Sequence, residues 1–114
     1  MIALIAALSA AMAITAGAFG AHAASGPLQA EWLKTGGMYQ LVHAVGVLSL
    51  FRTTRMPSIT MLIGSAIFSF TLYAMALGAP HWLGAVTPLG GALMIAGWLG
   101  VAWHFKQTLA SPAP

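Results

Sequence analysis

Six polar side chains lie in or beside apolar stretches of the chain, where a polar group must find either a protein partner or a ligand. Two of them are imidazoles, which can bind a ligand or relay a proton near neutral pH. The others carry hydroxyl or amide groups, which can line a binding cavity or join helices by hydrogen bonds. A ligand-binding cluster and a buried polar cluster are therefore both open interpretations of His22, Tyr39, Gln40, His43, Ser69 and Tyr73.

The residues that the sequence lacks exclude much other chemistry. There is no cysteine and no aspartate, and Glu31 is the one acidic residue. Thiol catalysis, disulfides, iron–sulfur clusters and paired carboxylates cannot be built from these residues. A histidine-based enzyme would need a nucleophile or a metal, and two histidines make a poor zinc site, so we expect no enzymatic activity and no metal. Haem held between His22 and His43 is the alternative cofactor hypothesis.

The composition is typical of a protein surrounded by lipid. Hydrophobic residues make up 60% of the 114 residues and charged residues 4%, whereas an ordinary soluble domain has about 25% charged residues. The four basic residues are scattered along the chain, which is too sparse a pattern for nucleic-acid recognition. We therefore expect the lipid bilayer to be the main partner and no nucleic acid to bind.

The apolar runs predict an all-α membrane protein with four transmembrane helices in an up-and-down antiparallel bundle. Residues 1–106 are expected to form one domain, and residues 107–114 a loose C-terminal tail. A signal peptide is the competing interpretation of the first run, because Ala21-His22-Ala23 fits a cleavage site. The run has no basic start and is long for a signal peptide, which favours a retained span. The predicted spans cover about 2–24, 38–51, 56–77 and 88–105.

The connector after the first span decides where His43 lies. Residues 28–35 predict a short interfacial helix anchored by Trp32, and Gly36-Gly37 predicts a break before the second span. With a start at Met38, His43 lies about 8 Å inside the outer end of its helix and His22 about 3 Å inside its own. The two imidazoles then meet in the outer half of the bundle. If the second helix begins near Trp32, His43 falls at the midplane and the pairing fails.

Small residues and basic residues predict how the helices pack and how they are oriented. Glycines and alanines recur at four-residue spacing in the first span, and small residues allow helices to approach closely. Arg52, Arg55 and Lys106 share one side of the predicted bundle with both termini, and Lys34 lies on the other. The excess of basic residues predicts that both termini are cytoplasmic. The glycines expected at helix contacts are Gly17, Gly20, Gly90, Gly97 and Gly100.

Several segments together resemble the signature of a known family. They are Gly17-Ala-Phe-Gly-Ala-His22, Tyr39-Gln-Leu-Val-His43-Ala, Gly64-Ser65 with Phe68-Ser69 and Leu72-Tyr73, and Thr87-Pro-Leu-Gly-Gly91 with Gly97-Trp98. The chain is similar in these segments to the "domain of unknown function 423" family, which also includes the eukaryotic transmembrane protein 256. The resemblance implies a four-span protein of the bacterial inner membrane, and it implies no activity.

Three functional hypotheses follow from these observations. The first is a non-enzymatic structural or accessory helix bundle that self-associates or joins a larger membrane complex, which the small-residue faces favour. The second is a small-molecule or ion binder, or a minimal transporter, that uses the six-residue polar cluster in the outer half. The third is a haem binder with two histidine ligands.

Overall fold

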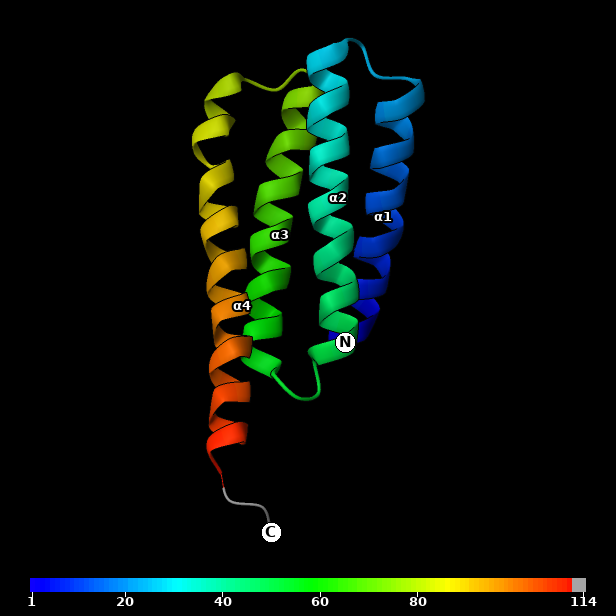
Figure 1. Ribbon diagram of the computed structural model, residues 1–114. Helices are drawn as coiled ribbons and strands as arrows, with labels where there is room; N and C mark the ends of the chain where they lie inside the picture. The colour runs from blue at the N-terminus through cyan, green and yellow to red at the C-terminus, as the bar shows by residue number, and fades with distance from the viewer. Residues whose placement is uncertain (112–114) are drawn as a thin grey trace.

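The computed structural model describes residues 1–111, and every regular element in that range is helical. Consecutive long helices alternate in direction, and the first helix begins at the end of the molecule where the last helix finishes (Figure 1). The prediction of an all-α protein is confirmed. The elements are α1 (Ile2–His22), α2 (Pro27–Leu50), α3 (Arg55–Ala76), the short 3-10 helix η1 (His81–Ala85) and α4 (Thr87–Ala110).

Three segments are long and apolar enough to cross a membrane. They are Ile2–His22, Arg55–Ala76 and His81–Ala110, the last of which includes η1 and α4. Each exceeds the roughly 20 apolar residues that a spanning helix needs. α2 is long enough, with 24 residues, but it carries Glu31, Lys34 and several uncharged polar residues and does not reach the same mean hydropathy.

The long helices form an open row rather than a closed bundle. α1 packs on α2, α2 on α3, and α3 on α4, while α1 touches α3 only slightly. Figure 1 shows α1 and α4 at the two edges of the row. α2 and α3 thus have a packed neighbour on each side, whereas α1 and α4 have one. The row leaves one groove between α1 and α3 and another between α2 and α4.

α2 is one continuous helix, which corrects the prediction of an interfacial helix followed by a break. Pro27 occupies its first turn, where a missing N–H costs nothing, and the helix runs through Gly36-Gly37 to Leu50. Two glycines inside a helix cost only about 1 kcal/mol each, and here both allow close packing. A Cβ on Gly37 would lie 2.8 Å from the carbonyl oxygen of Ala13. A Cβ on Gly36 would lie 2.7 Å from the Tyr73 ring.

Four of the five predicted packing glycines do lie at close helix contacts. A Cβ on Gly20 would come within 2.9 Å of the Leu33 Cβ, and one on Gly100 within 2.9 Å of the Pro57 ring. Cβ atoms on Gly90 and Gly97 would overlap Phe68 and Met61 of α3. Gly17 is the exception, because a Cβ there would meet nothing within 4 Å. The α1–α2 approach at this level depends on Gly37.

Local signals fix the ends of the later helices. α3 ends at Ala76, and Gly78 follows with a φ of +106°, which glycine readily adopts. The N–H of Ala79 donates to the carbonyl of Ala74 and that of Gly78 to Met75, which is a Schellman cap. α4 continues to Ala110, so residues 107–110 are its last turn rather than loose tail as predicted. Residues 112–114 lie outside the described range.

The core is thin and is shared by all four long helices. One side chain from each forms a buried cluster at the end of the row that carries the termini: Ala6, Val47, Met61 and Val101. α1 buries only Ala6, Ala13 and Gly20 along its whole length. The remaining faces of α1 present large apolar side chains outward, among them Leu4, Leu8 and Ile14.

Candidate functional site

Gln40 is the centre of a polar network that joins three helices. Its side chain is 1% exposed. The Tyr73 hydroxyl of α3 donates to Gln40 Oε1 at 2.6 Å, and Gln40 Nε2 donates to the Ser9 hydroxyl of α1 at 3.0 Å. Both ends of the amide are therefore satisfied within the protein, as burial in apolar surroundings requires. Ser9 was missed in the sequence because a single serine in an apolar run carries no distinguishing signal.

Ser69 supplies a second polar link between α2 and α3. Its hydroxyl donates to the Gly36 carbonyl oxygen at 2.8 Å, and it is fully buried. The main-chain oxygen of Gly36 is inside α2, where it also accepts a helical hydrogen bond, so the bond from Ser69 uses its second lone pair. Gly36 thus serves both this bond and the close approach of Tyr73. The sequence predicts a helix break at this glycine and indicates neither role.

His43 joins α2 to α4 and is held in one tautomer. Its Nδ1 lies 2.7 Å from the Tyr39 carbonyl oxygen, and the Trp98 indole N–H donates to its Nε2 at 2.9 Å. A carbonyl can only accept and an indole N–H can only donate. His43 therefore carries its proton on Nδ1 and is neutral in this arrangement. Trp98 was part of the family resemblance but was not among the predicted site residues.

His22 lies apart from the other five predicted cluster residues, which corrects its pairing with His43. It is exposed at the last turn of α1. Gln40 bonds to Ser9, so His43, one turn further along α2, is level with the start of α1 and about 24 Å along the axis from His22. The two imidazoles cannot be axial ligands of one haem at that separation. The described residues contain no group of three potential metal ligands.

Tyr39 differs from the buried members of the cluster. Its ring packs against Phe68, with centroids 4.9 Å apart, and stacks on His43 at 6.4 Å. The side chain nevertheless stays 45% exposed. The structure thus divides the predicted cluster into a Gln40–Tyr73–Ser69 part between α2 and α3, and a Tyr39–His43 part facing α4.

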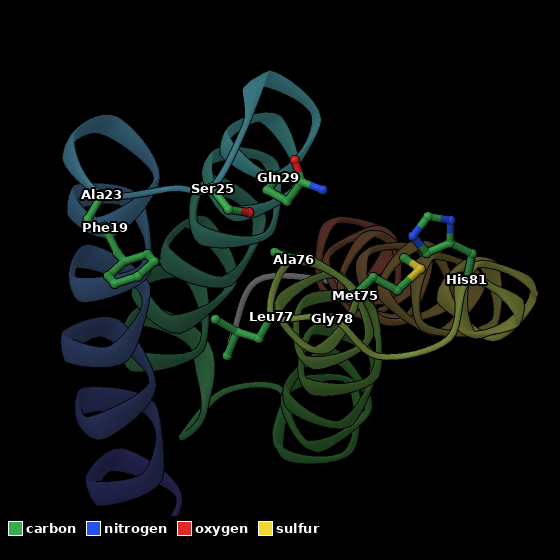
Figure 2. Close-up of a pocket in the computed structure, with 9 residues that line it drawn as sticks. All are labelled: Phe19, Ala23, Ser25, Gln29, Met75, Ala76, Leu77, Gly78 and His81. Atoms are coloured by element: carbon green, nitrogen blue, oxygen red, sulfur yellow. The ribbon is translucent and has the colours of Figure 1, made fainter.

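Open hollows lie in both grooves and at one end of the row. The α2–α4 groove contains a cavity of about 370 Å³, and the α1–α3 groove contains two of about 240 and 230 Å³. Another cavity, of about 340 Å³, lies where the α1–α2 connector meets the end of α3; Figure 2 shows the residues that line it. Its lining includes Ser25, Gln29 and His81 but no carboxylate, lysine or arginine side chain. The neighbouring ring of His81 contacts Trp32 edge-on at 5.3 Å.

The fold and these contacts define an all-helical protein with long apolar helices and an internally paired polar interior. Residues 16–91 match the model of a family described as "Protein of unknown function (DUF423)". The chain belongs to this family of membrane proteins of unknown function.

The relatives with curated names are similar over most of their length. A UPF0382 membrane protein of Haemophilus influenzae is 38% identical, over 89% of this chain and 90% of its own. A UPF0382 membrane protein of Staphylococcus saprophyticus is 37% identical, over 84% and 88%. The UPF0382 inner membrane protein YgdD of Escherichia coli is 33% identical, over 83% and 81%. No solved structure matches the chain.

Replacing His43 and, as a control, His22 tests the His43–Trp98 hydrogen bond directly. We expect His43→Phe to destabilise the protein by about 1–2 kcal/mol, because it leaves the Trp98 N–H without its acceptor between apolar helices. His22→Phe changes an exposed residue and should cost less than about 0.5 kcal/mol. Reversible unfolding in mixed micelles, followed by circular dichroism, measures both. Equal losses for the two variants would contradict the structural role assigned to His43.

Proposed function

We propose that the chain is a non-enzymatic structural or accessory protein of the bacterial inner membrane, with four spans, that self-associates or joins a larger membrane complex. The observation that carries this proposal is the open row of helices. α1 and α4 each have one packed neighbour, and α1 buries only three small residues. In lipid, helices associate through close van der Waals packing and interhelical hydrogen bonds, and the two edge helices have unused faces for such contacts.

The position of α2 supports its role as the fourth span. It packs between α1 and α3, so its polar side chains Gln40 and His43 meet protein rather than lipid. At 24 residues it is about 36 Å long, which is enough to cross a hydrocarbon core of about 30 Å. Glu31 and Lys34 lie in its first turns, towards the end where a span meets water. A central helix of this kind can cross the membrane with a lower mean hydropathy than an edge helix, because less of its surface faces lipid.

The pairing of the polar groups supports a structural role over transport. Gln40, Ser69 and His43 each make a hydrogen bond to another helix, and the second nitrogen of His43 bonds to the Tyr39 carbonyl of its own helix. A transport pathway would need polar groups that can release one another and bind a solute. The predicted orientation, with both termini cytoplasmic, rests on Arg52, Arg55 and Lys106 at the end of the row that also holds the termini (Figure 1).

Single cysteines placed in this cysteine-free chain test both the topology and the assembly. We expect Thr53→Cys to react with a membrane-impermeant maleimide only in inverted membrane vesicles, and Ser25→Cys only in intact spheroplasts. Thr53 lies in the α2–α3 turn and Ser25 in the α1–α2 connector. Labelling of both cysteines from the same side would contradict the four-span arrangement.

Single cysteines in the same cysteine-free chain also test whether the protein associates with other chains through its edge helices, α1 and α4. We expect Leu8→Cys on α1 or Leu99→Cys on α4, both outward-facing, to form disulfide-linked dimers or adducts with a larger membrane protein when membranes are oxidised. Ser65→Cys, at a buried position in α3, is the control and should form none. Failure of cysteines along both edge faces to cross-link, together with a monomeric mass in lipid nanodiscs, would refute the assembly role.

A further inference from the structure

We propose that the α2–α4 groove binds a neutral, membrane-soluble carbonyl compound with a flat ring, the chemical class that includes the quinones. The site is the cavity lined by Tyr39, His43, Phe68, Gly91, Met94, Ile95 and Trp98. The inference goes beyond the structural role proposed above but rests on its four-span topology, because that topology places the cavity at hydrocarbon depth.

The Tyr39 hydroxyl is the feature that calls for a ligand. It makes no hydrogen bond to any described residue, whereas the hydroxyl of Tyr73 is paired with Gln40. Tyr39 lies about 18 Å from the start of α2, near the middle of a helix about 36 Å long. Tyr39 is 45% exposed, and in the proposed topology its exposed part meets lipid, where no water is available and an unpaired hydroxyl group is unfavourable. A ligand that accepts a hydrogen bond removes this cost.

The other polar groups of the cavity restrict what the ligand can be. Both nitrogens of His43 are in use, one with the Tyr39 carbonyl and one with the Trp98 N–H. Tyr39 therefore offers the free donor, and a carbonyl oxygen is the simplest acceptor for it. No lysine, arginine or acidic side chain lines the cavity. An ionic ligand, such as a lipid phosphate, would find no counter-charge there.

The shape of the cavity suits a flat ring. Its volume of about 370 Å³ falls within the range of small-molecule sites, about 300–1,000 Å³. Three aromatic side chains, Tyr39, Phe68 and Trp98, line it and can pack against a ring face or edge. Gly91 leaves room at the α4 side, because a Cβ there would meet only a Phe68 ring carbon at 3.9 Å.

The α1–α3 groove has the opposite character and serves as the internal control. The polar side chains that line it all take part in hydrogen bonds: Thr15 donates to the Ala11 carbonyl, Tyr73 to Gln40, and Gln40 to Ser9. Its cavities are also smaller, at about 240 and 230 Å³. A flat ring should therefore prefer the α2–α4 groove, which is larger and is lined by three aromatic side chains.

The test uses menadione, a neutral naphthoquinone, and the full chain in lipid nanodiscs. Trp32→Phe, Trp82→Phe and Trp103→Phe leave Trp98 as the one fluorescent indole. We expect saturable quenching of Trp98 by menadione above the linear quenching that lipid-dissolved probe produces. 2-Methylnaphthalene has the same ring system without the carbonyls and should compete at least tenfold more weakly.

Variants assign the binding to the groove. In the single-tryptophan background, Tyr39→Phe removes only the hydroxyl and should weaken menadione binding at least tenfold. Gly91→Leu should abolish saturable quenching by filling the cavity. Thr15→Val, in the α1–α3 groove, should leave the affinity unchanged. Circular dichroism confirms that each variant keeps its helix content, and Ile95→Phe is a second filling variant if Gly91→Leu does not fold.

Three outcomes would overturn the proposal: linear quenching alone, equal affinity in the chain with and without the Tyr39 hydroxyl, or equal competition by 2-methylnaphthalene. A fourth outcome would also overturn it: menadione shows no saturable binding, and Tyr39→Phe converts a dimer of the chain into a monomer. The Tyr39 hydroxyl would then bond to a second copy of the chain rather than to a ligand. The cysteine labelling described above separates the two proposals. If menadione does not bind but the two cysteines are labelled from opposite sides, only the ligand site is refuted. If Thr53→Cys and Ser25→Cys are labelled from the same side, both proposals lose their basis.

Discussion

Gly90→Ala is expected to destabilise the protein by about 3 kcal/mol, the upper end of the cost of overpacking a tight contact. A Cβ on Gly90 would overlap the main-chain nitrogen of Phe68 and the carbonyl oxygen of Gly64, and main-chain atoms cannot move aside as a flexible side chain can. The contact is reciprocal, because a Cβ on Gly64 would lie 2.8 Å from the Gly90 oxygen. One methyl group should therefore force α3 and α4 apart.

The next residue provides the matched control. Gly91→Ala places its methyl group 3.9 Å from a Phe68 ring carbon of α3, which is ordinary van der Waals contact. Because alanine is the better helix former, this variant should be neutral or more stable by up to about 1 kcal/mol. Thermal unfolding in detergent, followed by circular dichroism, compares the two. Similar midpoints for Gly90→Ala and Gly91→Ala would show that the α3–α4 contact is looser than the structure describes.

Gln40→Leu is expected to cost about 2–3 kcal/mol, because it leaves two hydroxyl groups without their partner. Tyr73 loses its acceptor and Ser9 loses its donor. The cost of a buried unpaired polar group, about 1–3 kcal/mol, exceeds the value of the bond itself. The loss should loosen α1 in particular, because Gln40 is its polar link to the rest of the row.

A double-mutant cycle separates the hydrogen bond from simple packing. Tyr73→Phe alone should destabilise the protein, but in the Gln40→Leu background it should cost much less, because the hydroxyl that it removes is already unpaired. Adding Ser9→Ala should recover further stability. Unfolding free energies in mixed micelles measure the coupling. Additive losses for Gln40→Leu and Tyr73→Phe would contradict the network.

The candidate site was predictable in part. Ser69 and Tyr73 stood out as polar side chains in an apolar stretch that need partners, and both bond to α2. The cost of polar groups in lipid correctly indicated that Gln40 and His43 face protein. His22 was wrongly placed with them, because it lies exposed in the last turn of α1, at the end of a helix, where an imidazole needs no protein partner. Trp98 and Ser9 were missed because a partner on another helix leaves no pattern in the sequence.

By itself, the sequence determined the class of protein: its composition requires lipid as the main solvent, and its apolar runs and helix-end residues set the long helices and most of their connections. The tertiary structure decided the register between the helices. Gly36-Gly37 is a break by local propensity, but the fit of Gly37 against Ala13 and of Gly36 against Tyr73 makes it a point of close approach within a continuous α2. That continuity separates His43 from His22 by about 24 Å and turns it towards Trp98. Helix propensity acts over a few neighbouring residues, whereas register depends on contacts between residues far apart in the chain, and only the folded structure reveals those contacts.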